Sequence, residues 1–397
     1  MSKKDEETIA EQRRRCAQVM AQINKKAKHN VIAYASEVPN AYVLRYPTGC
    51  MSLDIDLGGG FPASGMSILS GPDGAGKTAL IYLTMAMNQR IRGERSSLAL
   101  AAVEFLPDYF FMRYCGVQVA IPDEMIEQQQ EIREERGVPL FTKEEIKEFK
   151  RQVGDFCVIR GATGEEMLDA VLTCFASKSF DIVGLDSINS FMSQAEAETD
   201  GIGDTIRQAT KAAPLSRFCD RFHPLTLGMD GPNQTLLLAT GQVRANRERM
   251  YANMKAYVEV MPWAIKHAAL IRVLLWKSNK VKATSGENKG DVISSNMVWE
   301  ITKGKAGTHD GIRGETEFTY EKLLDNYSTV VQAGMKYGVL KETKGIFSII
   351  RPEDGAILVE KIPGVTQLVE AMKNDVQFEL SLRREILAAA GHVCTYT

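Results

Sequence analysis

The chain has 397 residues with 48 basic and 50 acidic side chains, which gives a formal net charge of −2. A hydrophobic fraction of 44% with 25% charged residues is typical of a folded globular protein, and the near-neutral balance excludes a basic nucleic-acid coat and an acidic tail protein. At roughly 150 residues per domain, this length predicts two or three structural units.

The cysteines and the apolar runs indicate the cellular compartment in which the protein is expected. The seven cysteines are scattered and form no C-x-x-C pair, which argues against a disulfide scaffold or a zinc ribbon and favours a reducing cytoplasm. The N-terminus has no apolar signal-peptide region, and no apolar run is long enough to cross a bilayer. We therefore expect a cytoplasmic protein with no membrane partner.

The first predicted unit is residues 1–40. Residues 6–28 contain no proline or glycine, which favours a helix. Its apolar residues form only a thin stripe, made of Ile9, Val19, Met20, Ile23 and Ala27. A helix with so narrow an apolar face needs a partner to stay folded, so we expect an oligomerisation segment. The alternative is a solvated helix on its own domain.

The second predicted unit is residues 41–319, in which short apolar runs alternate with helical stretches. The runs that predict buried strands are residues 66–69, 98–103, 180–185 and 235–239. Strands that alternate with helices favour a mostly parallel, twisted sheet with helices on both faces. The predicted fold class is therefore α/β.

Two further segments are distinguished by composition. Residues 122–152 carry nine acidic and six basic side chains and predict one or two solvated helices broken near residues 137–139. They form either a surface insertion into the core or a functional acidic patch. Residues 320–397 contain a predicted helix, a hairpin near residues 344–352 and a final helix near residues 365–390. We expect this last stretch to form a small α/β C-terminal domain.

A glycine-rich motif joins the predicted strand at residues 66–69 to a glycine-free apolar helix at residues 79–91. It fits G-x-x-x-x-G-K-[ST] and consists of Gly71, Pro72, Asp73, Gly74, Ala75, Gly76, Lys77 and Thr78. Between a strand and a helix, the backbone N–H groups of such a loop and the helix N-terminus can hold phosphate oxygens. Lys77 can reach the terminal phosphates and Thr78 can ligate Mg²⁺. The alternative is a chance glycine-rich turn.

Two carboxylates follow predicted strands and could complete such a site. Asp186 follows the strand at residues 180–185 and fits the acidic position that holds Mg²⁺ in P-loop enzymes. Glu104 directly follows the strand at residues 98–103, which would place it at the same carboxyl edge of the sheet, where it could activate water. The alternative for each is an ordinary polar residue at a strand end.

The sequence around these motifs resembles one family. The run T-G-C-M-S-L-D-I-D-L-G, starting at Thr48, leads into the glycine-rich loop, and Asp108, Arg113 and Gly116 follow Glu104 at fixed offsets. In these features the chain resembles the RecA family of DNA strand-exchange ATPases, including its phage UvsX-type members. The resemblance extends from about residue 48 to about residue 390 and implies a RecA-like P-loop ATPase core.

The resemblance implies where bound ATP and Mg²⁺ would lie. By position, Glu104 resembles the catalytic glutamate, while Asp108 and Phe111 resemble the residues that hold adenine. Tyr320 matches a tyrosine that packs near the base. Lys77 would share the catalytic role through the terminal phosphates.

The resemblance also implies two further parts of the catalytic machinery. Gln242 would sense the terminal phosphate and pass that state to a DNA-binding loop, although this chain has Gly241 where the family has asparagine. Lys303 and Lys305 resemble paired lysines that reach the nucleotide of the neighbouring subunit. They would neutralise charge that develops on its terminal phosphate.

A basic segment follows the Gln242 motif. Residues 244–282 carry nine basic and two acidic side chains with aromatic residues between them, a composition that can neutralise phosphates and stack on bases. A solvated basic helix is the alternative. Residues 193–204 and 245–261 correspond to the two DNA-binding loops of the family. The DNA-binding candidates are Arg207, Lys211, Arg244, Arg247, Arg249, Tyr251 and Lys255. Trp263 is expected in the core, and His267 in the core or an interface.

Together these features predict a DNA-dependent ATPase that polymerises on single-stranded DNA as a helical filament. It would pair that strand with a homologous duplex and exchange strands in recombination and repair, in a bacterial or phage-infected host cytoplasm. Two alternatives stay open. One is a ring-forming DNA helicase motor on the same core. The other is a non-catalytic filament or mediator protein that keeps the phosphate loop as a structural switch.

Overall fold

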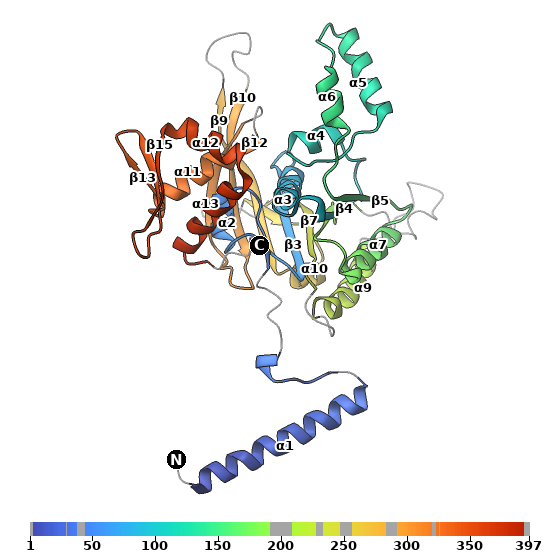
Figure 1. Ribbon diagram of the computed structural model, residues 1–397. Helices are drawn as coiled ribbons and strands as arrows, with labels where there is room; N and C mark the ends of the chain where they lie inside the picture. Colours follow the sequence, from blue (N-terminus) through green and yellow to red (C-terminus); the bar gives the residue numbers. More distant parts are fainter. Residues whose placement is uncertain are drawn as a thin grey trace.

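The computed structural model describes residues 3–28, 30–37, 44–190, 209–227, 233–246, 256–282, 292–319, 323–324 and 326–392. These residues form an N-terminal helix, a large α/β body and a smaller C-terminal unit (Figure 1). None of the helices within these ranges is both long enough and apolar enough to span a membrane.

The body is built on a ten-stranded sheet. In spatial order the strands are β12 (Leu323–Leu324), β11 (Arg313–Thr319), β10 (Val292–Lys303), β9 (Ile271–Lys282), β3 (Gly65–Gly71), β7 (Leu236–Ala245), β6 (Ile182–Asp186), β4 (Ser97–Ala102) and β5 (Asp155–Ile159). A tenth strand, β8 (Tyr257–Glu259), pairs with the end of β7. The six strands from β9 to β5 pair in parallel, whereas β10, β11 and β12 extend the sheet antiparallel from β9. The expected α/β fold with a mostly parallel sheet is confirmed.

Alternate residues of the central strands face opposite layers of helices. Leu98 and Leu100 of β4 belong to the core on one face of the sheet, and Ala99 and Ala101 belong to the core on the other. Because both faces are buried, such strands are continuous apolar runs in the sequence. The covering helices are α3 (Lys77–Arg92) and α4 (Tyr109–Tyr114) on the first face, and α7 (Gly164–Ser177), α9 (Ala209–Leu227) and α10 (Trp263–Ala268) on the second.

The C-terminal unit is a three-stranded antiparallel sheet with three helices. Its elements are α11 (Asn326–Lys336), β13 (Leu340–Thr343), β14 (Ile346–Ile350), β15 (Ile357–Pro363), α12 (Gly364–Asn374) and α13 (Val376–Ala389). The hairpin predicted near residues 344–352 is formed by β13 and β14. The single final helix expected near residues 365–390 is instead two helices, because the Asp375 carboxylate accepts a hydrogen bond from Phe378 N and starts α13 as a new helix.

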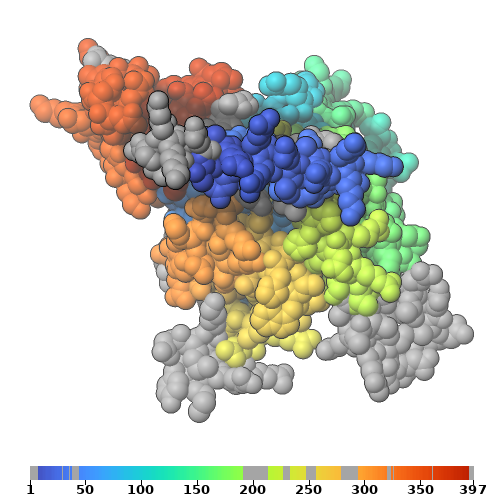
Figure 2. Space-filling model, turned by 90° about the horizontal axis from the view of Figure 1, so that it is seen from below, coloured from blue at the N-terminus to red at the C-terminus, as the bar shows by residue number. Residues whose placement is uncertain are grey.

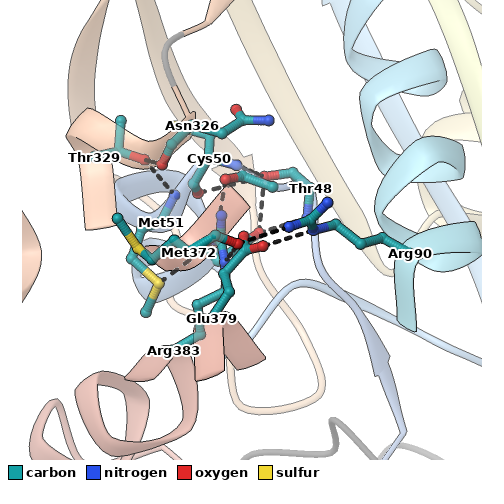
Figure 3. A network of polar contacts seen from close by, with 11 residues as sticks. Thr48, Cys50, Met51, Arg90, Asn326, Thr329, Met372, Glu379 and Arg383 are labelled. Atoms are coloured by element: carbon teal, nitrogen blue, oxygen red, sulfur yellow. Dashed lines mark hydrogen bonds and ion pairs between the residues drawn. The ribbon is translucent and has the colours of Figure 1, made fainter. Parts of the chain in front are cut away.

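A buried polar network joins this unit to the body (Figure 3). Arg90, in the last turn of α3, donates from Nε to Glu379 Oε2 at 2.6 Å, and Arg383 Nε donates to Glu379 Oε1 at 2.9 Å. Arg383 also donates to the carbonyl oxygen of Gly49, 3.1 Å away. The helix that follows the glycine-rich loop is therefore tied at its far end to α13.

The segment before β3 supplies part of this junction. Here β1 (Arg45–Tyr46) and β2 (Phe61–Pro62) form a separate two-stranded sheet, and α2 (Met51–Asp56) lies between them in the sequence. Met51 N donates to Thr329 Oγ1 of α11 at 3.1 Å. Short 3₁₀ turns occupy Ala35–Glu37 and Gly93–Arg95.

The predicted insertion is a helical hairpin that projects from the body (Figure 1). It contains α5 (Asp123–Glu135) and α6 (Lys143–Phe149), so of the one or two helices expected here there are two, and the chain breaks between them as expected. Its aromatic side chains pack on α4, since Phe110 stacks on Phe141 at 5.9 Å and meets Phe149 edge-on at 5.5 Å between ring centroids. The insertion therefore rests on the helix that follows Glu104.

The N-terminal helix α1 (Lys3–Ala27) lies apart from the body in Figure 1 and forms a ridge in front of it in the view from below (Figure 2). Ile9, Val19 and Ile23 are 37%, 52% and 38% exposed. Near the end of the helix, Asn24 Oδ1 accepts hydrogen bonds from Val31 N and Ile32 N, which ties these two residues to the helix. Ile9, Val19 and Ile23 are thus partly exposed to solvent in this chain.

Replacing Asp54 with asparagine should flatten the pH dependence of stability in mildly acidic solution. Asp54 is fully buried in α2 and accepts two hydrogen bonds from Thr48, at 2.7 and 2.8 Å. Burial raises the pKa of Asp54 from 3.8 to about 6, against the opposing effect of those hydrogen bonds. The folded state therefore binds a proton that the unfolded state has lost, and the contribution of Asp54 to stability falls as pH rises from about 4 to about 6.

Denaturant unfolding of the wild type and the Asp54→Asn variant across this pH range would measure that contribution. The difference in unfolding free energy between the two proteins should shift in favour of the variant as pH rises. An unchanged difference across the range would contradict the expected titration of Asp54.

Candidate nucleotide-binding and catalytic site

A cavity of about 320 Å³ lies at the carboxyl edge of the central parallel strands. The loop after β3 forms one wall, while β4, β6 and β7 each contribute residues at or near their carboxyl ends. Because parallel strands end at the same edge, residues that follow different strands meet there. The predicted residues that line the cavity are Asp73, Gly74, Lys77, Thr78, Glu104, Asp108, Phe111, Asp186 and Gln242.

The loop between β3 and α3 has the geometry of a phosphate cradle. Gly74 and Gly76 have φ angles of +71° and +97°, which favour glycine. Gly76 is the N-cap of α3, so the free N–H groups of the first helical turn lie at the loop. Lys77 Nζ donates to the carbonyl oxygens of Gly71 and Pro72 at 2.9 and 3.0 Å, which holds the ammonium group against the loop.

Two oxygen ligands suited to Mg²⁺ lie side by side at this loop. Thr78 Oγ1 donates to Asp186 Oδ2 at 2.7 Å, and Thr240 Oγ1 donates to the other carboxylate oxygen of Asp186. Mg²⁺ prefers oxygen ligands and in nucleotide sites takes one or two from protein and the rest from phosphates and water. Thr78 and Asp186 fit that requirement, and Thr240 orients the carboxylate. The described residues contain no group of three or more His, Cys, Asp or Glu that could hold a metal ion.

Three donors converge on one oxygen of Glu104. Ser187 Oγ donates to Glu104 Oε1 at 2.6 Å, Ser190 Oγ donates to the same atom, and Gln242 Nε2 donates to it at 3.1 Å. Burial raises the pKa of Glu104, but these hydrogen bonds and the nearby charge of Lys77 outweigh it, so the pKa is lowered overall. Glu104 is therefore ionised at neutral pH and can accept a proton from water.

Sequence reasoning missed Ser187 and Ser190. Both follow Asp186 at the carboxyl end of β6, and Ser187 Oγ lies 3.0 Å from Ser190 Oγ. The only sequence signal was their place directly after a predicted strand, where side chains reach the same edge as Glu104.

The far wall of the cavity is aromatic. Phe111 of α4 lines the cavity and meets Tyr82 of α3 edge-on at 5.9 Å between ring centroids. Asp108 Oδ1 accepts a hydrogen bond from Phe111 N at 3.0 Å and so caps the N-terminus of α4. This hydrogen bond holds the backbone of Phe111 in place at the cavity. The predicted base-binding pair is thus brought together, whereas Tyr320 lies outside the described residues.

The chain has sequence similarity to known proteins. No family model matches the chain. Curated relatives do: "Protein RecA" of Ruminococcus albus is 23% identical over 345 residues, covering 86% of this chain and 73% of its own length. "Protein RecA" of Thermus thermophilus is 24% identical over 374 residues, covering 94% and 93%, and that of Anaplasma marginale is 24% identical over 348 residues, covering 87% and 82%. The chain is thus similar to RecA proteins over most of its length, and its fold is RecA-like.

Two lysines of the RecA-like core lie away from the cavity. β10 runs antiparallel to β9, and Lys303 at its end pairs with Arg272, near the start of β9. The end of β10 therefore points to the amino edge of β3, opposite the glycine-rich loop. Lys303 Nζ donates to the carbonyl oxygens of Lys266 and His267 at 2.9 and 2.8 Å. Lys303 and the exposed Lys305 are thus not brought to the cavity of their own chain.

Burial lowers the pKa of Lys303 to about 8, and the positive charges of Lys305 and Arg272 act in the same direction. An anion brought close to Lys303 would favour its charged form and raise this pKa.

The predicted DNA-binding residues fall largely outside the described part of the chain. Arg207, Arg247, Arg249, Tyr251 and Lys255 lie outside it, as does the whole segment 193–204; the side chain of Lys211 in α9 is likewise not described. Arg244 is exposed near the end of β7. Its position on the β7–β8 hairpin leaves it available to a partner.

Part of the basic charge between residues 244 and 282 is used inside the RecA-like core. Arg272 forms an ion pair with Glu259, Lys266 Nζ donates to the Glu259 carbonyl oxygen, and Lys277 Nζ lies over the Phe318 ring at 4.4 Å. The excess positive charge that this segment could offer to nucleic acid is therefore smaller than its composition indicates.

The expectation that Trp263 is a core residue is wrong. Trp263 is 73% exposed on α10, where its ring stacks on His267 at 5.4 Å between centroids. Ile265 and Ala268 occupy the buried face of this helix. With the core side taken by these two residues, the i, i+4 pair of Trp263 and His267 faces solvent, which also excludes a core position for His267.

Proposed function

We propose that this chain is an ATP-dependent DNA recombination protein. It would assemble on single-stranded DNA, pair that strand with a homologous duplex and exchange strands, with ATP hydrolysis dependent on DNA. The observation that carries this proposal is the contact of Gln242 with Glu104. Gln242 lies on β7, the strand that continues into the β7–β8 hairpin and its basic segment, so one residue connects the pocket to the predicted DNA-binding surface.

The residues of the cavity divide the chemistry of ATP hydrolysis between them. The backbone of the glycine-rich loop and Lys77 bind the phosphates, while Thr78 and Asp186 would hold Mg²⁺, which neutralises phosphate charge when bound. Glu104, kept ionised by its three donors, accepts the proton of the attacking water. Phe111 and Asp108 would bind the base at the aromatic wall.

The position of Lys303 and Lys305 supports a role at a second copy. They lie at the edge of the sheet opposite their own cavity, so they would serve a nucleotide bound by a neighbouring subunit. Contacts between different surfaces of successive copies generate either rings or helical filaments. The solvent-open stripe of α1 would add a second contact between neighbours, as the resemblance implies.

Replacing Lys303 and Lys305 together with alanine should lower DNA-stimulated turnover by about 100-fold, because the charge developing on the phosphate loses its donors from the neighbour. Nucleotide affinity of the monomer should be unchanged, since neither lysine reaches its own cavity. Steady-state phosphate release and fluorescent-nucleotide titration would measure the two quantities.

A mixing experiment tests whether these lysines act between copies. The Lys77→Ala variant has intact trans lysines, and the Lys303→Ala/Lys305→Ala variant has an intact cavity, so a mixture should recover turnover that neither protein shows alone. Failure to recover activity in the mixture would contradict the trans role.

Phosphate release by purified protein with and without single-stranded DNA tests the proposed function, with the Lys77→Ala variant as negative control. Stimulation by DNA, together with extended filaments in negative-stain electron microscopy with DNA and a slowly hydrolysed ATP analogue, would support a recombinase. Direct strand exchange between a single strand and a homologous duplex is then the deciding assay. Closed rings would favour a helicase motor, and DNA binding with no turnover would favour a non-catalytic mediator.

A further inference from the structure

The turn after β6 touches both the catalytic cavity and the base of the β7–β8 hairpin. On the cavity side, Ser187 and Ser190 donate to Glu104. On the other side, Asn189 faces the end of β7 and the residue that follows β8. This turn therefore lies where a movement of residues in the cavity can be passed to the base of the hairpin.

Asn189 uses both ends of its side-chain amide to bind backbone. Its Oδ1 accepts from Gln242 N at 2.8 Å, and its Nδ2 donates to the Val260 carbonyl oxygen. Val260 N in turn donates to the Gln242 carbonyl oxygen at 3.0 Å. These three hydrogen bonds join Asn189, Gln242 and Val260 in a closed set, and the two different backbone partners fix the orientation of the amide.

Gly241 lies between Met261 and this arrangement. A Cβ atom at Gly241 would lie 2.8 Å from Met261 Cε, which is too close, and 3.5 Å from Asn189 Oδ1, which is an ordinary contact. A side chain there would therefore displace the end of Met261 before it touched the amide of Asn189. Gly241 has no side-chain amide to support Gln242, and Asn189 supplies one from the turn after β6.

We propose that Asn189 is a positioning residue that couples Gln242 to the base of the β7–β8 hairpin; this inference rests on the proposed function. Gln242 contacts Glu104 through its side chain and Asn189 through its backbone N–H, so a shift of Gln242 toward a bound phosphate is passed to Val260 through the amide. Without that amide, Gln242 still reaches Glu104 and still accepts from Val260 N. Its N–H and the Val260 carbonyl oxygen are then no longer held to the turn after β6, so the base of the hairpin loses the fixed geometry that passes the shift on.

Two substitutions of Asn189 separate its hydrogen bond to the Val260 carbonyl oxygen from the one it accepts from Gln242 N. Asn189→Asp keeps an oxygen that accepts from Gln242 N but replaces the donor to Val260 with an oxygen that faces a carbonyl. Asn189→Ala removes both bonds. The matched control is Asn233→Asp, because the buried Asn233 also bridges two backbone groups, accepting from Thr235 N at 3.0 Å and donating to the Phe175 carbonyl at 2.6 Å, at the opposite end of β7.

The experiment compares DNA-free turnover, DNA-stimulated turnover, thermal unfolding and hydrogen exchange in the full-length proteins. Asn189→Asp should keep DNA-free turnover within about three-fold of wild type and lose about 5- to 150-fold of the stimulation by DNA, the usual range of coupling between two sites. A slowly hydrolysed ATP analogue should change exchange in peptides covering residues 241–246 and 256–261 of the wild type, and this response should be absent in both Asn189 variants. Asn233→Asp should lower the unfolding temperature and retain the coupling.

The exchange measurement needs no DNA, so it separates this inference from the proposed function. If the wild type shows no DNA stimulation, the proposed function fails, and the analogue-induced exchange response of the hairpin still tests Asn189. A normal exchange response in both Asn189 variants would overturn the inference. So would a loss of coupling in Asn233→Asp as large as that in Asn189→Asp, because general destabilisation would then account for both.

Discussion

Replacing Glu104 with glutamine should lower ATP turnover by about 10²- to 10⁴-fold, the range that a positioned general base contributes. Glutamine keeps the shape of the side chain and an oxygen that Ser187 and Ser190 can donate to, but it cannot accept a proton from water. Nucleotide affinity should stay within about two-fold of wild type, because the phosphates are held by the glycine-rich loop and Lys77. Single-turnover hydrolysis and nucleotide titration would measure the two effects separately.

The control for this substitution is Glu94→Gln. Glu94 is exposed and does not line the cavity, and its carboxylate accepts a hydrogen bond from Gly154 N at 3.1 Å. Its turnover should match that of the wild type. Turnover by the Glu104→Gln variant within about three-fold of wild type would exclude Glu104 as the base.

Replacing Glu379 with alanine should destabilise the protein by about 3–5 kcal/mol, the usual cost of removing one partner of a buried ion pair. The Glu379 and Arg383 side chains are 2% and 0% exposed, so the substitution leaves the Arg383 charge buried without its carboxylate. The same carboxylate binds Arg90 of α3, and this contact is lost as well. Urea unfolding followed by circular dichroism would report the change as a lower midpoint with a similar slope.

An exposed ion pair provides the comparison for Glu379. Asp169 and Arg221 are 62% and 64% exposed at their side chains, and Asp169→Ala should change stability by about 0–1 kcal/mol. Replacing Glu379 and Arg383 together with leucine and methionine should recover much of the loss, since an apolar pair can replace a buried ion pair. A cost of Glu379→Ala no larger than that of Asp169→Ala would show that the network contributes little.

The sheet and the phosphate loop were predictable because their signals are local. Strands buried on both faces are continuous apolar runs, and the glycine-rich loop has a fixed spacing between a strand and a helix. Asp186 and Glu104 were predictable from the rule that the carboxyl ends of parallel strands share one edge.

The supporting contacts of the site could not be predicted in the same way. Ser187, Ser190 and Asn189 belong to no spacing motif, and their roles depend on how the turn after β6 packs against β7. The sequence also could not give the position of Lys303 relative to the cavity, because that depends on the antiparallel pairing of β10 with β9. Trp263 was misplaced since the apolar residues around it do not show which face of the short helix α10 meets the core.

The junction between the body and the C-terminal unit (Figure 3) also determines where the chain can be divided into fragments. Met51, Ile55 and Met87 come from the body, yet they belong to the same apolar cluster as α11 and α13. A fragment starting at residue 326 would lack these side chains and present the inner faces of its helices to water, so it should not fold alone. The body and the C-terminal unit should then melt as one cooperative transition. Two separately expressed halves, divided between β11 and α11, would acquire structure only by associating with each other.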